Sequence, residues 1–155
     1  MRVLLAVDGS PHSRFAVAAV TDRPWPAGTV VEVLSVIHAA APLALDPAFV
    51  IAAIHVDQMA EGRQASTAII DFAVGELRKK APDLTVTTKL VEGNPTDAIL
   101  EEAREWDADI IIVGSHGYGR LKRMVLGSVA GAVVANAHCS VLVAREKPHA
   151  QHAAA

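Results

Sequence analysis

Runs of apolar residues alternate along the chain with amphipathic stretches and short polar turns. Three runs, 3–7, 29–37 and 108–113, are almost continuously apolar, which is typical of strands buried on both faces of a sheet. Residues 84–91 alternate between apolar and polar positions, as in a strand nearer an edge, and 140–144 form a last short apolar run. The pattern predicts a strand at each of these places, with 108–113, the most apolar, at the centre of the sheet.

The stretches between these runs carry the start signals of helices. Ser10 provides an N-cap and Pro11 a first helical residue for a helix that ends near residue 20. Asn94 and Pro95 repeat this signal ahead of a helix that ends near residue 106. Residues 128–136 predict the last helix.

The stretch from residue 46 to Lys80 predicts either one long helix or a broken one. Its amphipathic pattern favours a helix throughout. Gly62 and Gly75 favour a break, because each costs about 1 kcal/mol relative to alanine in a helix.

The alternation of strands and helices predicts the fold class. Strands that are apolar on both faces and are separated by helices form a parallel sheet with helices on each side. We therefore predict a three-layer α/β fold with a five-stranded parallel sheet. In such sheets ligands bind beyond the carboxyl ends of the strands, so the loops after Val7, Ile37 and Val113 are the places to search for a site.

Length, composition and charge exclude some classes of function and predict the domain organisation. A chain of 155 residues predicts a single domain, over 1–146, followed by a flexible tail over 147–155. A net charge of −3 argues against a general nucleic-acid binder. The sequence has neither a signal-peptide pattern nor an apolar stretch of about 18 residues, so we expect no association with membranes. Because Cys139 is the single cysteine, a reducing cytoplasm is the expected compartment.

A glycine-rich loop follows the run that ends at Val113. Gly114 and Gly117 are separated by two residues, and nine residues later Gly127 and Ser128 open the last predicted helix, which gives the pattern G-x2-G-x9-G-S. Glycines let the backbone approach a ligand closely, so that several N–H groups can converge on one anion. The N-terminus of the helix adds free N–H groups and the positive end of its dipole. The loop predicts a phosphate site, with a purely structural loop as the alternative.

Several other side chains have both a functional and a structural interpretation. Arg120, Lys122 and Arg123 add positive charge between the two glycine pairs, or lie on a solvated face. His138 and Cys139 are adjacent but lack the further ligands that a metal needs. We therefore predict no metal site and no cysteine nucleophile there.

Two segments of the chain resemble the universal stress protein family. They are LLAVDGSPHSRFAVAAV near the N-terminus and GSHGYGRLKRMVLGSVAGAVVANAHCSVLVAR near the C-terminus. The resemblance implies a five-stranded, Rossmann-like fold similar to that of the adenine nucleotide alpha hydrolases. The G-x2-G-x9-G-S/T pattern marks the branch of the family that binds ATP, and it is intact here. The implied ligand is ATP, accompanied by Mg²⁺.

The resemblance also implies which residues hold the nucleotide. The adenosine meets the end of the first strand, where Asp8 accepts its hydrogen bonds, and the loop and last helix hold the ribose and phosphates. The implied set is Ala6, Val7, Asp8, Val36, Val113, Gly114, His116, Gly117, Gly127, Ser128 and Val129. Asp8 has an alternative as a turn residue, and His116 has one as a plain loop residue.

A homodimer is the last implication of the resemblance. It forms by antiparallel pairing of the last strand, Val141, Leu142 and Val143, with its copy, and an apolar edge strand needs such cover. The chain departs from the family at Ser140, where members often have proline, and at 118–120 in the most variable part of the loop. Neither departure affects the glycines.

Three functions follow from these features. The first is an ATP-binding regulatory module of the stress response with at most slow ATP hydrolysis. The second is an ATP-consuming enzyme of the same fold, although the first loop lacks the Ser-Gly-Gly-x-Asp-Ser signature of the pyrophosphatase-type ligases. The third is a dimeric interaction protein that binds another adenine nucleotide, such as cAMP.

Overall fold

The computed structural model describes residues 1–37, 48–117 and 126–146, with the side chains of 48–59 excepted. Within these residues, parallel strands form one sheet in the order β3-β2-β1-β4-β5. The strands are β1 (Arg2–Ala6), β2 (Val30–Ile37), β3 (Thr85–Glu92), β4 (Ile110–Gly114) and β5 (Ser140–Ala144). The five-stranded parallel sheet predicted from the sequence is confirmed.

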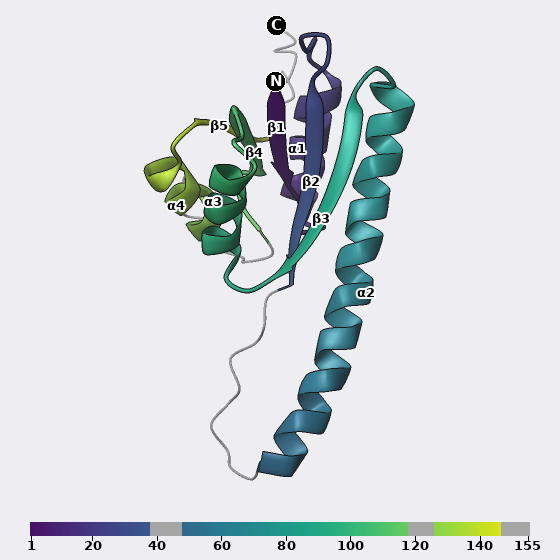
Figure 1. Ribbon diagram of the computed structural model, residues 1–155, viewed down its shortest axis with the longest axis vertical. Coiled ribbons are helices and arrows are strands. Elements are labelled where there is room, and N and C mark those ends of the chain that lie inside the picture. The colour runs from purple at the N-terminus through teal and green to yellow at the C-terminus, as the bar shows by residue number, and fades with distance from the viewer. Residues whose placement is uncertain (38–47, 118–125, 147–155) are drawn as a thin grey trace, which may run out of the picture.

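Helices cover both faces of this sheet (Figure 1). They are α1 (Pro11–Thr21), α2 (Ala48–Lys80), α3 (Pro95–Glu105) and α4 (Ser128–Asn136). α1 and α2 lie on one face, and α3 and α4 lie on the other. The three layers confirm the predicted fold class.

Side chains of the inner strands alternate between two cores, one on each face of the sheet. In β1, Val3 and Leu5 belong to the core under α1 and α2, whereas Leu4 belongs to the core under α3 and α4. All three side chains are fully buried. Because both faces are covered, consecutive positions must be apolar, which explains the continuous apolar runs of the sequence.

Two helices begin with the caps that the sequence predicts. The side chain of Ser10 accepts a hydrogen bond from the amide of Ser13, and that of Asn94 accepts from the amides of Thr96 and Asp97. A proline follows each cap in the first turn. These caps set where the chain turns after β1 and after β3.

The strand order corrects one prediction. The run 108–113, expected at the centre, forms β4, which lies between β1 and β5, and β1 is the central strand. Hydrophobicity reports burial on both faces, and several strands of one sheet share that burial, so the most apolar run need not be the middle one. The edge position expected for 84–91 is confirmed by β3.

α2 is a single helix of 33 residues, which decides between the long and the broken helix. Gly62 and Gly75 both lie inside it. A Cβ added at position 75 would meet nothing within 4 Å, so this glycine faces open space and no close contact requires it. The tail expected over 147–155 lies outside the described residues.

Candidate functional site

A cavity of about 790 Å³ opens beyond the carboxyl ends of β1, β2 and β4, on the side of α3 and α4. The chain leaves β1 toward α1 on one face of the sheet and leaves β4 toward α4 on the other, so the connections at the carboxyl ends of these two strands diverge. Ligands of open α/β sheets bind at such a point. The volume also falls within the roughly 300–1,000 Å³ that is usual for small-molecule sites.

Every residue predicted for the nucleotide site lines this one cavity. They are Ala6, Val7, Asp8, Val36, Val113, Gly114, His116, Gly117, Gly127, Ser128 and Val129. Segments more than a hundred positions apart in the sequence are thus brought together at one end of the sheet. The nucleotide-binding role of these residues stays a prediction. Arg120, Lys122 and Arg123 lie outside the described residues.

Two helix N-termini face the cavity, and they differ in their caps. At α3, the side-chain oxygen of Asn94 accepts hydrogen bonds from the amides of Thr96 and Asp97, at 2.9 and 3.3 Å. At α4, the N-cap is Gly127, which has no side chain to accept from the first amides. Those amides have no partner within the helix and carry the positive end of its dipole. The start of α4 is therefore the better place for an anion in this cavity.

The two ends of the glycine loop are joined by backbone hydrogen bonds. The amide of Gly127 donates to the carbonyl of Ser115 at 2.7 Å, and the amide of Ser115 donates to the carbonyl of Ala144 at 2.9 Å. A Cβ added at position 127 would lie 3.0 Å from Cα of His116. Glycine therefore permits the close approach that brings the start of α4 to the end of β4.

Asp8 has the contact of a turn residue and also lines the cavity. Its Oδ1 accepts a hydrogen bond from the amide of Ser10 at 2.9 Å, which is turn chemistry. Its Oδ2 lies near Gly117, where an added Cβ would be only 2.9 Å away. One oxygen of the carboxylate, Oδ1, is thus held by the turn, and the side chain still lines the cavity.

Two histidines meet beside the glycine loop. The rings of His12 and His116 are 5.1 Å apart in an edge-to-face arrangement, and Nδ1 of His116 lies 3.2 Å from Oγ of Ser115. The backbone of His12 also contacts the loop, since a Cβ at Gly114 would lie 2.7 Å from it. The start of α1 thus packs directly on the loop and orients the His116 side chain.

Sequence reasoning missed part of the cavity wall. The missed residues are Ser13, Leu34, Asn94, Pro95, Thr96, Ile99, Ala130 and Ala132. Leu34 shares a strand face with Val36, so the alternation along the strand was a signal for it. Asn94 and Pro95 were interpreted only as a cap and a first helical residue, because no sequence pattern near them indicates that this helix begins beside the cavity.

Glu32, Lys89 and Glu102 form a charged cluster in the layer next to this cavity. Glu32 precedes Leu34 on the same face of β2, and Glu102 follows Ile99 by about one turn of α3, while Leu34 and Ile99 line the cavity. Lys89 pairs in register with Leu34 and forms an ion pair with Glu102. The cluster went unrecognised in the sequence, although a glutamate within an apolar run was a signal for it.

Glu32 is the group of this cluster whose ionisation is most altered. Its side chain belongs to a residue only 7% exposed, and its Oε1 has no hydrogen-bond partner among the described residues. Burial raises the pKa of Glu32 to about 7; the hydrogen bond and repulsion of Glu102 add to the rise, and Lys89 opposes it. A separate hydrogen bond, between Lys89 and Glu102, raises the pKa of Lys89. The charge of this layer therefore changes near neutral pH.

Other chemical groups of the described residues add little to the site. No cluster of three His, Cys, Asp or Glu within the described ranges could hold a metal ion. Burial raises the pKa of the Cys139 thiol, which lowers the fraction of reactive thiolate.

No helix among the described residues is long and apolar enough to span a membrane.

Comparison with known sequences identifies relatives along most of the chain. The model of the Universal stress protein family matches residues 1–145. A universal stress protein of Mycobacterium tuberculosis is 32% identical over 144 residues, which cover 93% of this chain and 45% of the relative. One from Thermus aquaticus is 33% identical over 149 residues, covering 92% and 97%. The chain spans about half the length of several curated relatives that it matches.

Solved structures share the same architecture. The hypothetical protein MJ0577 matches with a TM-score of 0.79 and 25% identity, over 95% of this chain and 96% of that one. A family member from Arabidopsis thaliana with AMP bound has a TM-score of 0.67 at 17% identity, over 96% and 93% of the two chains. A universal stress protein in complex with cAMP has a TM-score of 0.65 at 22% identity, over 95% and 98%. At these identities the last two matches concern the fold alone.

Proposed function

Because this chain belongs to the universal stress protein family, we propose that it is an ATP-binding regulatory module of the stress response. In this role the nucleotide occupies its site without rapid turnover and changes the conformation or the partners of the protein. The site is the cavity between β1 and β4.

The observation that carries the proposal is the N-terminus of α4, which begins at Gly127 without a side-chain cap among the described residues and borders a cavity lined by the whole implied nucleotide set. Free amides and the helix dipole favour an anion at Ser128 and Val129. The glycine loop adds unhindered backbone beside them. This end of the cavity therefore suits a phosphate chain.

Another part of the cavity suits an adenosine. Leu34 and Val36 of β2, Ile99 of α3 and Val113 of β4 give it apolar walls. Small-molecule sites combine such walls with a few polar groups that fix orientation. Asp8 lines the same cavity beside Gly117, and its carboxylate can accept hydrogen bonds from the nucleoside.

ATP is proposed rather than a smaller adenine nucleotide because of the length of the loop. The pattern G-x2-G-x9-G-S places two glycine clusters and a helix start along one wall, which is more anion-binding backbone than one phosphate needs. AMP and cAMP are the specific alternatives, since two proteins of the same fold carry them.

Mg²⁺ would accompany ATP on the phosphate oxygens. The described residues have no cluster of three His, Cys, Asp or Glu for a dedicated metal site, and magnesium commonly binds through phosphates and water. It would screen the phosphate charge, while the amides of α4 hold the phosphates. We expect at most slow hydrolysis, which an assay for released ADP measures.

We further propose that the protein acts in the cytoplasm as a homodimer joined through β5. Val141, Leu142 and Val143 are half-buried on an edge strand of the monomer. An apolar edge with free backbone groups favours pairing with a second copy.

Calorimetric titration of nucleotide-stripped protein tests the nucleotide. We expect saturable binding of ATP with Mg²⁺ that is tighter than binding of ADP, AMP or cAMP. The proposal is wrong if no adenine nucleotide binds at millimolar concentration. Tighter binding of AMP or cAMP than of ATP would replace ATP by that nucleotide.

Gly117→Ala tests the location of the site. Its new Cβ would meet Oδ2 of Asp8, the end of a side chain that can move, so the fold is kept while the carboxylate is displaced. We expect ATP affinity to fall about ten-fold, corresponding to the loss of a charge-assisted hydrogen bond. Gly75→Ala, where the added Cβ meets nothing within 4 Å, is the matched control and should bind ATP as the natural chain does.

A further inference from the structure

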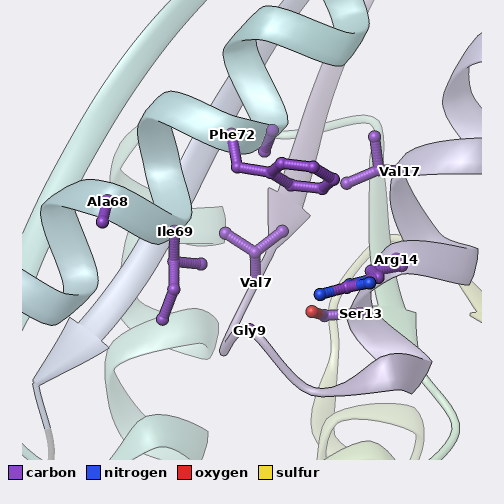
Figure 2. Close-up of a pocket in the computed structure, with 9 residues that line it drawn as sticks. Val7, Gly9, Ser13, Arg14, Val17, Ala68, Ile69 and Phe72 are labelled. Carbon is purple, nitrogen blue, oxygen red and sulfur yellow. The ribbon is translucent and has the colours of Figure 1, made fainter.

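A second cavity, of about 280 Å³, lies between α1 and α2 (Figure 2). It is on the face of the sheet opposite to α3 and α4, and we call it the α1–α2 pocket. Ile69 and Phe72 reach into it from α2, Val17 from α1, and Val7 from the end of β1. Its walls are therefore mainly aliphatic and aromatic.

Among the residues that line this pocket, Phe72 is unusual in its exposure to solvent. It is 51% exposed, while its neighbours Ala73 and Val74 are buried in the core. A single exposed apolar side chain is ordinary on a protein surface. Phe72 differs because it borders a concave apolar space, where exposed aromatic surface favours the burial of a ligand.

Arg14 supplies the charge of the α1–α2 pocket. Its guanidinium carbon lies 5.5 Å from the centre of the Phe72 ring, and Figure 2 shows it extending from α1 toward the same space. No carboxylate among the described residues forms an ion pair with it. The hydroxyl of Ser13, the other polar side chain of the wall, already donates to the carbonyl of Ser10. The pocket thus offers one cation and little other hydrogen bonding.

We propose that the α1–α2 pocket binds a small amphipathic monocarboxylate, such as a medium-chain fatty acid. The apolar body lies against Val7, Val17, Ile69 and Phe72, and the carboxylate pairs with Arg14. Charge complementarity selects an anion, because guanidinium groups bind carboxylates through paired hydrogen bonds. The size of the cavity, just under the usual range for drug-sized ligands, selects a short chain over a nucleotide or a peptide.

Titration with sodium octanoate, below its micelle concentration and without nucleotide, tests this site independently of the proposed ATP function. Amide and side-chain resonances followed by NMR should shift saturably at Arg14, Val17, Ile69 and Phe72. The uncharged analogue 1-octanol should bind the same place about ten-fold more weakly, because it lacks the charge-assisted contact.

Arg14→Gln and Arg78→Gln form the matched pair of variants. Both remove one exposed positive charge, but Arg78 is on α2 away from the lining of the pocket. We expect Arg14→Gln to lower octanoate affinity to that of octanol and to leave octanol binding unchanged, whereas Arg78→Gln changes neither. Phe72→Ala should weaken both ligands.

Three results would overturn the proposal. The first is no saturable shift with octanoate. The second is equal effects of the two arginine variants, which would mean a nonspecific charge effect. The third is a set of shifts centred on Leu34 and Ile99, which would place the ligand in the larger cavity on the other face.

Discussion

Glu32 is an ionisable group with buried apolar residues beside it on β1 and on its own strand, whereas its partner on β3 is Thr87. On β1 it pairs with Leu4, and the next residue on its own strand face is Leu34, and both are fully buried. The protonated carboxyl avoids the desolvation that charging it would cost, and it can donate a hydrogen bond to Glu102. The pKa near 7 therefore reflects a folded state that prefers neutral Glu32.

The first prediction is a dependence of stability on pH that Glu32→Gln removes. Because the pKa of Glu32 is raised from 4.5 to about 7 on folding, the folded chain binds more protons between these values. Its contribution to stability is fully present below pH 4.5 and is lost as the pH rises to about 7. Gln is neutral throughout and can donate to Glu102, so the variant should be about 1–3 kcal/mol more stable than the natural chain at pH 8.

Urea unfolding at a series of pH values measures this effect as the difference between variant and natural chain. Glu101→Gln is the matched control, since Glu101 is on α3 but exposed. It should change the free energy of unfolding little and without this pH profile. A constant difference between Glu32→Gln and the natural chain from pH 4 to pH 8 would contradict the prediction.

At the scale of the element, α4 differs from α1 and α3 in how its first turn is capped. α1 and α3 begin with side-chain caps, whereas α4 begins at Gly127 with none. A cap normally stabilises a helix by about 1 kcal/mol. The first amides of α4 lack this stabilisation but can donate to an anion. We therefore expect that a change which stabilises the start of α4 with a negative charge weakens anion binding there.

The second prediction is that Ser128→Asp makes the protein more stable and a weaker ATP binder. A carboxylate in the first turn interacts favourably with the helix dipole, by about 0.3–1 kcal/mol. The same charge repels the phosphates, so ATP affinity should fall at least about ten-fold, which is about 1.4 kcal/mol. Thermal unfolding and calorimetric titration measure the two effects on one sample.

Ala135→Asp is the control on the same helix. Ala135 is exposed near the end of α4, where a negative charge opposes the dipole. This variant should be slightly less stable than the natural chain and should bind ATP normally. If Ser128→Asp left ATP affinity unchanged, the start of α4 would not hold the phosphates.

Signals of short range made most elements predictable from the sequence. Ser10 and Asn94 marked helix starts correctly because a cap acts on amides only two or three positions away. The glycine pattern likewise located one wall of the site, since its residues are close in sequence. Features of longer range were not predictable in this way: the sequence left open whether α2 is continuous, and no local pattern indicated the partners of Glu32.

At the scale of the whole molecule, strand order is what the sequence could not provide. β1 and β4 are far apart along the chain and pair at the centre of the site, and β4 was wrongly expected to be the middle strand. The wall formed by Asn94, Pro95 and Ile99 was missed for the same reason. The packing of the layers decides which helix lies beside the end of each strand, and local sequence patterns do not predict that packing.

The two edges of the sheet differ in a way that favours dimerisation at only one of them. β3 is the first edge, and it exposes Thr85, Thr87 and Thr88. β5 is the second edge, where Val141, Leu142 and Val143 are half-buried in the monomer. Polar residues discourage edge pairing, and apolar ones leave surface that a second copy can cover.

The third prediction is therefore a dimer that a charge on β5 disrupts. In Val141→Lys, each copy would bring a lysine to the shared edge, and like charges opposed across paired strands are destabilising. We expect light scattering after gel filtration to give the mass of a dimer for the natural chain and of a monomer for this variant. Thr87→Lys at the β3 edge is the matched control and should stay dimeric. Circular dichroism confirms that both variants are folded, and a natural chain that is already monomeric, or a Val141→Lys variant that stays dimeric, would place the interface elsewhere.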